Sequence, residues 1–199
     1  MLTLGSMRAD KQKRIARETM EIYVPIANRI GLHKVHLELA EESFKYLYPM
    51  RYKILKHAAE KALIDRQPTI QAILTNIEAA MRANGIHAEF KYRQRTISNI
   101  YNRMLKRNDT FNNIYNIFEV KVIVDKIGDC YLALGVLHSI YQPIPSRFKD
   151  YIAIPKTNGY QSLHSTTMGP NGTPIQLHIR TKEMEEIAEY GIISHGIKY

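Results

Sequence analysis

Apolar residues recur every three or four positions through the opening segments of the chain, which is the spacing of one face of an α-helix. A first helix is predicted to be kinked or ended by Pro25, because proline lacks the backbone N–H of a helix interior. A second helix, over roughly residues 33–48, is expected to close at Pro49. The apolar face of the first helix is predicted to consist of Ile15, Thr19, Ile22, Ile26 and Ile30.

Two more helices are predicted before the pattern changes, over about residues 50–65 and about residues 68–84. Pro68 fits the first turn of the later helix, where the missing N–H has no cost. Gly85 is expected to stop that helix, since glycine adopts the left-handed conformation that often follows a helix. The first 85 residues are therefore expected to be entirely helical.

From Ile86 onward the chain changes to short stretches that alternate between strand and helix patterns. Strands are predicted in HAEFKYR, IFEVKVIVD and DYIAIP, with a hairpin about a Pro-Asn-Gly turn in QSLHSTTMGPNGTPIQLHIRT. Helices are predicted in TISNIYNRMLKR, GDCYLALGVLHSIYQP and KEMEEIAEYGIISHGIKY. The predicted fold class is α+β, with a helical first part, a mostly antiparallel or mixed sheet after it, and a boundary between about residues 45 and 70.

The charge of the chain is concentrated in one segment. The formal net charge is +9, and His87–Arg107 contains six basic residues and one acidic residue. This favours a phosphate-rich ligand or nucleic acid, with a solvated basic surface as the alternative. The single cysteine, Cys130, allows no intramolecular disulfide, and the apolar runs are too short to cross a membrane. Since residues 1–18 also lack the apolar segment of a secretion signal, a cytoplasmic location is expected.

Two groups of basic residues are candidates for binding phosphate. Arg95 and Arg103 are eight positions apart and share one face of a predicted helix, with Asn99 between them and Arg93 just before them. Guanidinium groups bind phosphate oxygens in a bidentate way, although a solvated helix face has the same pattern. The second group lies in a loop stiffened by prolines and consists of Arg147, Lys149 and Lys156.

An aromatic residue and a histidine follow the second basic group. Tyr160 comes directly after an Asn158-Gly159 turn, which is expected to expose its ring for stacking on a base, with simple packing as the alternative. His164 is a candidate phosphate contact or a packed side chain, whereas His33 and His36 are expected on a helix surface. The sequence contains no HExxH, no Cys/His cluster, no Walker A sequence and no GxGxxG, so a zinc site and a P-loop are not expected.

The stretch RFKDYIAIPKTNGYQSLHSTTMGPNGTP resembles the synthetase domain of the RelA/SpoT family of (p)ppGpp synthetase/hydrolases, through its RxKD loop and its Y-Q-S-L-H segment. The segment IARETMEIYVPIANRIGLHKVHLELAEESFKYLYPMRY is similar to the end of the family's hydrolase domain and its helical connector. The resemblance implies a helical segment at residues 1–47 and a nucleotidyltransferase-like mixed sheet flanked by helices within residues 48–199. It also implies a fragment of a SpoT-like protein whose hydrolase motif lies upstream.

In this family the synthetase domain transfers pyrophosphate from ATP to the 3′-hydroxyl of GDP or GTP with Mg²⁺, and the hydrolase domain uses Mn²⁺. The resemblance implies a site for GDP, GTP or ppGpp at Arg147, Lys149, Lys156, Asn158, Tyr160 and His164. It implies an ATP-clamp-like group at Arg93, Arg95, Asn99 and Arg103. The implied partner is the upstream hydrolase domain of the same chain, and neither a membrane nor a nucleic acid is expected as a partner.

Two acids that the family uses are amides in this chain. Asn116 stands where the family has its Mg²⁺-binding aspartate, and Gln176 stands where it has a glutamate near the acceptor hydroxyl. Mg²⁺ is usually held by carboxylates, and each loss costs about 10²–10⁴-fold in rate, so neither position is expected to be catalytic and no metal or cofactor is expected in this chain. Glu119, three residues after Asn116, is expected on the opposite face of the strand. Further departures from the family pattern are Tyr92, Lys121 and His178.

The sequence therefore favours an inactive synthetase domain that is a scaffold or regulator of an upstream (p)ppGpp pyrophosphohydrolase domain. One alternative is an active GTP/GDP pyrophosphokinase with a rearranged metal site, which Asn116→Asp combined with Gln176→Glu would discriminate. Another alternative is a basic module that binds RNA or a protein, in which case RNA binding would depend strongly on salt.

Overall fold

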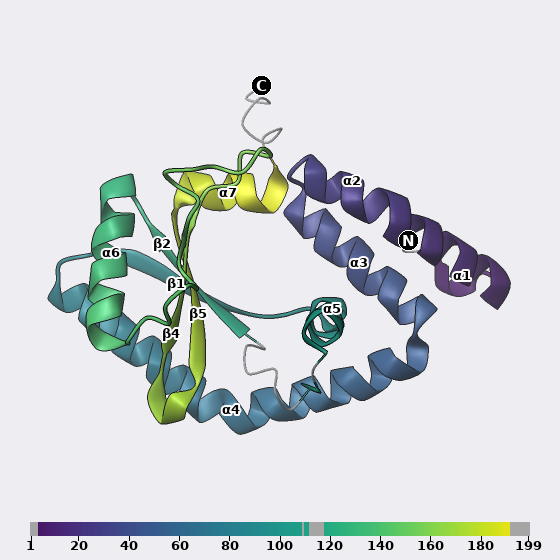
Figure 1. The fold of residues 1–199 in the computed structure, drawn as a ribbon, viewed down its shortest axis with the longest axis horizontal. Coiled ribbons are helices and arrows are strands. Elements are labelled where there is room, and N and C mark those ends of the chain that lie inside the picture. The colour runs from purple at the N-terminus through teal and green to yellow at the C-terminus, as the bar shows by residue number, and fades with distance from the viewer. Residues whose placement is uncertain (1–3, 109, 112–117, 192–199) are drawn as a thin grey trace.

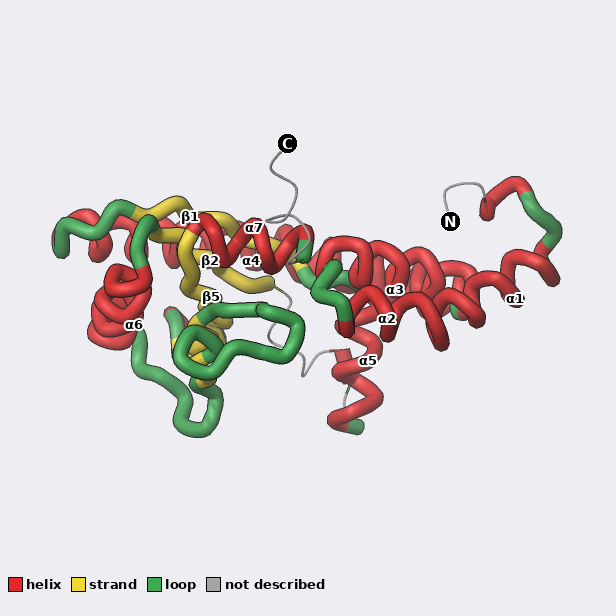
Figure 2. Tube along the Cα trace, turned by 90° about the horizontal axis from the view of Figure 1, so that it is seen from above, coloured by secondary structure: helices red, strands yellow, loops and turns green. Residues whose placement is uncertain are grey.

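A computed structural model describes residues 4–108, 110–111 and 118–191 of the chain (Figure 1). The first part is helical, as the apolar spacing predicts. It consists of a 3₁₀ turn at Leu4–Ser6, α1 (Ala9–Glu18), a π-helical turn at Thr19–Tyr23, α2 (Val24–Arg29), α3 (His33–Leu47) and α4 (Pro49–Ala83). The helix α3 packs against α1 and α2, and these three helices extend together to one side of the sheet (Figure 2).

The face that the first helices bury differs from the predicted one. Ile22, Ile26 and Ile30 are 50%, 49% and 46% exposed. The prediction was wrong because the π-helical turn at Thr19–Tyr23 contains more residues per turn than an α-helix, which rotates all later side chains about the axis. Pro25 lies at the start of α2 and does not end the helix. Thr19 of the predicted face is buried, and the other buried residues of these helices are Ala16, Val24 and Ala27.

The two helices predicted over residues 50–65 and 68–84 are one continuous helix, α4, with Pro68 in its interior. The predicted break was wrong because a single buried face runs past the proline. Pro68 lies on the exposed side of the helix, where water can satisfy the carbonyl that its missing N–H leaves free. Gly85, with φ of 68°, then ends the helix as predicted. The buried face consists of Leu55, Ala59, Ile70, Ile73, Ile77 and Met81.

The second part of the chain forms a five-stranded sheet with the order β1-β2-β5-β4-β3. The central pair, β2 and β5, is parallel and the other neighbours are antiparallel, so the sheet is mixed as predicted. The strands are β1 (Ala88–Gln94), β2 (Phe118–Val124), β3 (Lys149–Asp150), β4 (Leu163–Met168) and β5 (Pro174–Thr181). The helices of this part are α5 (Ile97–Arg107), α6 (Ile127–Ile140) and α7 (Lys182–Tyr190). The α+β fold class and the hairpin are confirmed.

The predicted strand in DYIAIP is wrong, because β3 ends at Asp150. The side chain Oδ1 of Asp150 accepts hydrogen bonds from the backbone N–H groups of Ile152 at 2.9 Å and Ala153 at 2.8 Å. Such a local bond turns the chain instead of extending it. The predicted closing helix is described to Tyr190, and residues 192–199 lie outside the described residues.

The sheet has one apolar face and one polar face. Strand alternation points Val120, Val122, Leu177 and Ile179 into the core that α4 and α6 cover. The residues between them on β2 and β5 therefore point to the other face, toward α7 (Figure 1). These residues are Glu119, Lys121, Gln176, His178 and Arg180. No helix in the described ranges is long and apolar enough to span a membrane.

Candidate functional site

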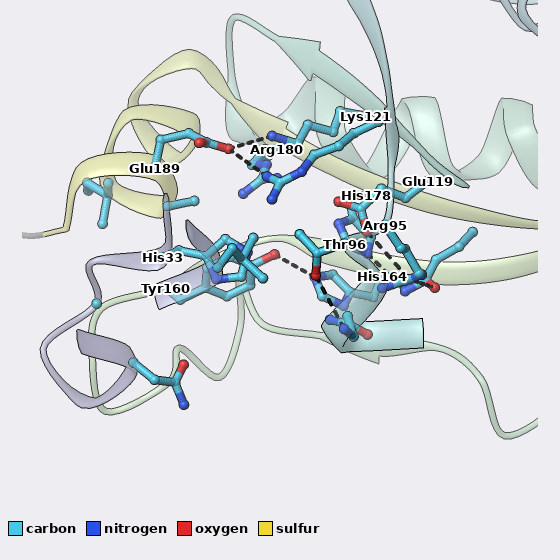
Figure 3. Close-up of a pocket in the computed structure, with 18 of the residues that line it drawn as sticks. His33, Arg95, Thr96, Glu119, Lys121, Tyr160, His164, His178, Arg180 and Glu189 are labelled. Atoms are coloured by element: carbon cyan, nitrogen blue, oxygen red, sulfur yellow. Dashed lines mark hydrogen bonds and ion pairs between the residues drawn. The ribbon is translucent and has the colours of Figure 1, made fainter. Parts of the chain in front are cut away.

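A cavity of about 240 Å³ lies on the polar face of the sheet (Figure 3). Its floor is made by β2, β4 and β5, and its walls by the end of β1, the start of α5, the helix α7 and the corner between α2 and α3. The cavity therefore lies between the helical part and the sheet. The residues of the corner that line it are Asn28, Gly31 and His33.

Four of the six residues predicted to bind a guanine nucleotide line this cavity, namely Lys156, Asn158, Tyr160 and His164. The Tyr160 hydroxyl and His164 Nε2 are 2.7 Å apart and share a hydrogen bond. Lys156 Nζ lies 4.8 Å from the centre of the Tyr160 ring, in a cation–π contact. The expectation of an exposed Tyr160 ring is wrong, since the ring is partly buried against these neighbours, and burial raises its pKa.

The other two predicted guanine-site residues, Arg147 and Lys149, line a neighbouring groove of about 390 Å³. Arg103 of the predicted ATP clamp lies in the same groove, away from the other three clamp residues. The groove and the cavity share a wall made by Lys156, His164 and Gln176. None of the described residues that line the groove is acidic, so its field is strongly positive.

The remaining clamp residues, Arg93, Arg95 and Asn99, line the cavity, but both arginines are paired with acids of the protein. Arg93 Nη1 lies 3.5 Å from Glu189 Oε1, and Arg95 Nη2 lies 3.4 Å from Glu119 Oε2. Arg95 Nη2 also donates a short hydrogen bond to Gln176 Oε1. Burial lowers the pKa of Arg95 and the charge of Arg93 lowers it further, whereas the charge of Glu119 raises it.

Of the two amide positions, Gln176 lies within the described residues and Asn116 does not. Asn116 lies outside the described residues, so the predicted opposition between its side chain and that of Glu119 stays a prediction. Gln176 lies on the cavity floor beside Glu119, its partner in the parallel register of β2 and β5. Gln176 Nε2 also lies 3.0 Å from His178 Nε2.

The described part of the cavity does not supply the ligands that Mg²⁺ prefers, which are carboxylates and water. Its two carboxylates are Glu119, paired with Arg95, and Glu189, paired with Arg93 and Lys121. Within the described ranges no group of three His, Cys, Asp or Glu side chains is arranged to hold a metal ion. The donor set therefore does not fit a magnesium site.

A buried ion network joins the sheet to α7 at the edge of the cavity (Figure 3). Lys121 Nζ donates to Glu185 Oε1 at 2.8 Å and to Glu189 Oε1 at 2.7 Å, and Arg180 Nε lies 2.8 Å from Glu185 Oε2. This network was not predicted from the sequence. Its signal was present, because Glu185 and Glu189 are one helical turn apart on a face that packs on alternating strand positions.

His33 was predicted to lie on a helix surface, and this is wrong, because it lines the cavity from the start of α3. Burial lowers its pKa to about 4, with a smaller lowering from Arg93. His36 is also partly buried, with Nδ1 3.1 Å from the Val24 carbonyl oxygen. Helical spacing could not reveal either position, since both depend on how α3 packs against other elements.

His164 and His178 stack on neighbouring strands at the cavity floor, with ring centres 3.9 Å apart and planes 8° apart. Burial lowers the pKa of His164 to about 2 and lowers the pKa of His178 well below 6.5. The His178 ring lowers the pKa of His164 further, and the charge of Arg180 lowers the pKa of both histidines, since a second positive charge nearby is unfavourable. Both rings are therefore neutral at neutral pH.

We expect the stability of the chain to fall as the pH decreases from 7 to 5. The unfolded chain takes up protons at histidines below about pH 6.5, whereas the folded stack does not, so each histidine destabilises the fold by about 2 kcal/mol at pH 5. His178→Gln should flatten the dependence of the free energy of unfolding on pH, as measured by urea denaturation at each pH. His87→Gln, at an exposed position, should keep the wild-type slope. Equal slopes for all three proteins would contradict this account of the stack.

The sequence matches a family model and several curated proteins. A sequence model described as the region found in RelA / SpoT proteins matches residues 92–199. Over 195 residues the chain is 46% identical to the bifunctional (p)ppGpp synthase/hydrolase SpoT of Escherichia coli K12. It is 44% identical to the guanosine-3′,5′-bis(diphosphate) 3′-pyrophosphohydrolase of Vibrio cholerae. Each alignment covers 98% of this chain, and the chain spans only 28% of the length of each relative.

Solved structures match this chain in fold over most of its length. Small alarmone synthetase 2 from Bacillus subtilis superposes with a TM-score of 0.55 and 26% identity, over 70% of this chain and 79% of that one. Small alarmone synthetase 1 from the same organism gives the same TM-score at 17% identity. The nucleotidyltransferase-like fold implied by the sequence resemblance is thereby confirmed.

Proposed function

The chain belongs to the RelA/SpoT family, and from this premise we propose that its synthetase-like part binds a guanine nucleotide without transferring pyrophosphate. In the whole protein this part, within residues 48–199, is a scaffold or regulator of a (p)ppGpp pyrophosphohydrolase domain, and the helical segment at residues 1–47 connects the two. The protein works in the cytoplasm, and its partners are that domain and GDP, GTP or ppGpp.

The observation that carries the proposal is the uncharged cavity floor at Gln176. Pyrophosphate transfer needs positive charge from a metal on the donor phosphates and an oriented acceptor hydroxyl. An amide oxygen contributes no formal charge, and the Gln176 oxygen is already bonded to Arg95. The nearby carboxylate of Glu119 is neutralised by the same arginine. Asn116, the second position without a carboxylate, adds to this deficit at the level of sequence.

Nucleotide binding is supported by what the site retains. Tyr160 supplies an aromatic ring close to two cations, with Lys156 Nζ 4.8 Å and the Arg180 guanidinium carbon 5.6 Å from the ring centre. The adjoining groove, which shares a wall with the cavity, is lined by four basic residues, Arg103, Arg147, Lys149 and Lys156. A planar base with a phosphate tail therefore matches the pair of depressions better than a purely apolar ligand would.

A regulatory role is supported by contacts between the nucleotide loop and the helical connector. Asn158 Nδ2 donates to the Asn28 carbonyl oxygen at 3.0 Å, at the corner between α2 and α3. A Cβ atom at Gly31 would come within 3.1 Å of the Asn158 carbonyl oxygen, so the two segments touch. A ligand that shifts the Asn158 loop would therefore shift the connector as well, provided that it binds the two arrangements unequally.

The test combines a transfer assay with a titration. The chain is incubated with ATP, GDP and Mg²⁺, and (p)ppGpp is measured by chromatography. GDP binding is measured by calorimetry with and without Mg²⁺. We expect no (p)ppGpp and GDP binding that does not depend on Mg²⁺. Tyr160→Ala should weaken GDP binding by about tenfold or more, because stacking on an aromatic ring contributes about 1–3 kcal/mol per base.

An active pyrophosphokinase is the outcome that would overturn the proposal, and it predicts clear (p)ppGpp production by the unmodified chain. In that case Asn116→Asp combined with Gln176→Glu identifies the reason. An unchanged rate would mean that the metal is held by other residues. The absence of GDP binding would also remove the regulatory ligand, although not the scaffold role.

A further inference from the structure

The contact between Arg95 and Glu119 is an internal ion pair inside the candidate nucleotide site. The two side chains are only 11% and 12% exposed, and they meet across the cavity wall from the end of β1 and the start of β2. Arg95 Nη2 lies 3.4 Å from Glu119 Oε2 and also donates to Gln176 Oε1. Both oxygens contact Nη2, whereas Arg95 Nε is buried without a hydrogen-bond partner among the described residues. The protein therefore neutralises the charge of this guanidinium without occupying all of its donors.

This pairing changes what the cavity can bind. A guanidinium free of partners takes two phosphate oxygens, and a buried one strongly favours an anion beside it. Here the anion is resident, so a phosphate that reached Arg95 would have to displace the Glu119 carboxylate or approach it closely. Both alternatives are unfavourable in a poorly hydrated site, where like charges repel strongly.

Among the described residues, the lining of the neighbouring groove includes no acid. Its described lining residues include Lys156 and Lys149 with Arg103 and Arg147, and none of them is acidic. Because His164 and Gln176 separate the two depressions, a ligand can place phosphates in the groove without contacting Arg95. The charge pattern therefore favours phosphate binding in the groove and disfavours it at Arg95 in the cavity.

The pair is not explained by a general need for ion pairs between these elements. Buried pairs contribute little net stability compared with packed apolar residues. The strands on either side of the pair, β1 and β2, are already joined by their antiparallel pairing from Ala88 to Gln94. Within the described ranges Glu119 contacts no cation other than Arg95 at ion-pair distance. The negative charge of Glu119 therefore offsets the positive charge of Arg95 at the cavity wall.

We infer that Glu119 sets the anion selectivity of the site by neutralising Arg95, so that the cavity rejects the triphosphate of a nucleoside triphosphate while the groove accepts the phosphates of a guanine nucleoside diphosphate. The part of this inference that concerns the guanine ligand rests on the proposed function. The closure of Arg95 by Glu119 does not, because it concerns only charges within the chain.

The test uses inorganic tripolyphosphate as the probe and isothermal titration calorimetry as the measurement. We expect Glu119→Gln, which keeps the shape of the side chain, to bind tripolyphosphate about tenfold more tightly than the unmodified chain, because it removes the resident anion. Glu89→Gln is the matched control. It removes the same charge from an exposed position on β1, where Glu89 pairs with Lys91 at 3.1 Å, and it should leave the affinity unchanged.

Arg95→Gln shows whether the gained affinity comes from the released guanidinium. In the unmodified chain it should not change tripolyphosphate binding, because Glu119 already neutralises the charge of Arg95. In combination with Glu119→Gln it should abolish the tenfold gain. A gain of equal size in Glu89→Gln, or a gain that survives the loss of Arg95, would overturn the inference, since either result would indicate a nonspecific effect of net charge.

Folding and nucleotide binding are measured in the same proteins. If Glu119→Gln melts at a lower temperature than the unmodified chain, tripolyphosphate should raise the melting temperature of the variant by more. Glu119→Ala should show the same larger increase. Failure of both variants to fold with the anion present would overturn the inference in favour of a purely structural role.

GDP binding to the unmodified chain separates the two proposals. GDP binding without a tripolyphosphate gain refutes only the role of Glu119, and a gain without GDP binding refutes only the proposed function.

Discussion

Replacing Lys121 by methionine is expected to lower the free energy of unfolding by about 3–5 kcal/mol, because it leaves buried carboxylates without their counter-ion. Lys121 is 5% exposed, and its ammonium group donates to Glu185 and Glu189 of α7. Burial raises the pKa of Glu189, but the hydrogen bond and the charge of Lys121, helped by Arg93 and Arg180, lower it overall. Replacing Lys121 therefore removes the main interaction that lowers the pKa of Glu189. Chemical denaturation at pH 7 measures the effect.

The strand next to Lys121 supplies a control for this experiment. Lys91 of β1 lies directly opposite Lys121 in the antiparallel register of β1 and β2. Its side chain is 50% exposed and pairs with the exposed Glu89. Lys91→Met should change the free energy of unfolding by less than about 0.5 kcal/mol, as expected for a surface ion pair. Similar losses for both variants would mean that the network at α7 does not stabilise the fold.

Most elements of the sheet could be predicted because their signals are local. The alternation in β1, the β-branched residues of β2 and the turn residues of the hairpin each specify their element within about ten residues. The failures occurred where a distant contact or a backbone irregularity decides the outcome. Pro68 does not interrupt α4 because the helix is buried along its other side. The π-helical turn before Pro25 rotates the buried face of the first helices, and the apolar spacing that predicts an α-helix does not predict such a turn.

The candidate site was predictable to the same degree. Strand alternation alone places Gln176 and His178 on one face, and the loop with Lys156 and Tyr160 lies beside them. That these residues, which lie far apart in the sequence, belong to one site was predicted only from the resemblance to a family. What could not be predicted is which charges neutralise one another. The pairing of Arg95 with Glu119 joins the loop after β1 to β2, and the position of His33 in the cavity depends on the packing of the connector.

A single carboxylate joins the connector to the helix that carries part of the predicted clamp. Glu41 of α3 accepts hydrogen bonds from the backbone N–H groups of Ile97 at 3.1 Å and Ser98 at 2.8 Å, at the start of α5. Thr96 caps the same helix through the N–H of Asn99 at 3.3 Å. The first amides of α5 are thus satisfied partly from within the sheet domain and partly from the connector. A carboxylate at a helix N-terminus is also favoured by the helix dipole.

We expect Glu41→Ala to lower the free energy of unfolding by about 2–4 kcal/mol, because two charge-assisted hydrogen bonds are lost and Ser98 is buried, so water cannot fully replace them. Amide hydrogen exchange at Ile97 and Ser98 should become faster. Glu42→Ala is the matched control, since Glu42 is 42% exposed and pairs only weakly with Lys45 at 3.7 Å. If nucleotide binding is coupled to the connector, GDP should slow exchange at the two α5 amides in the unmodified chain. Glu41→Ala should lose this protection, whereas unchanged protection would show that the site and the connector are independent.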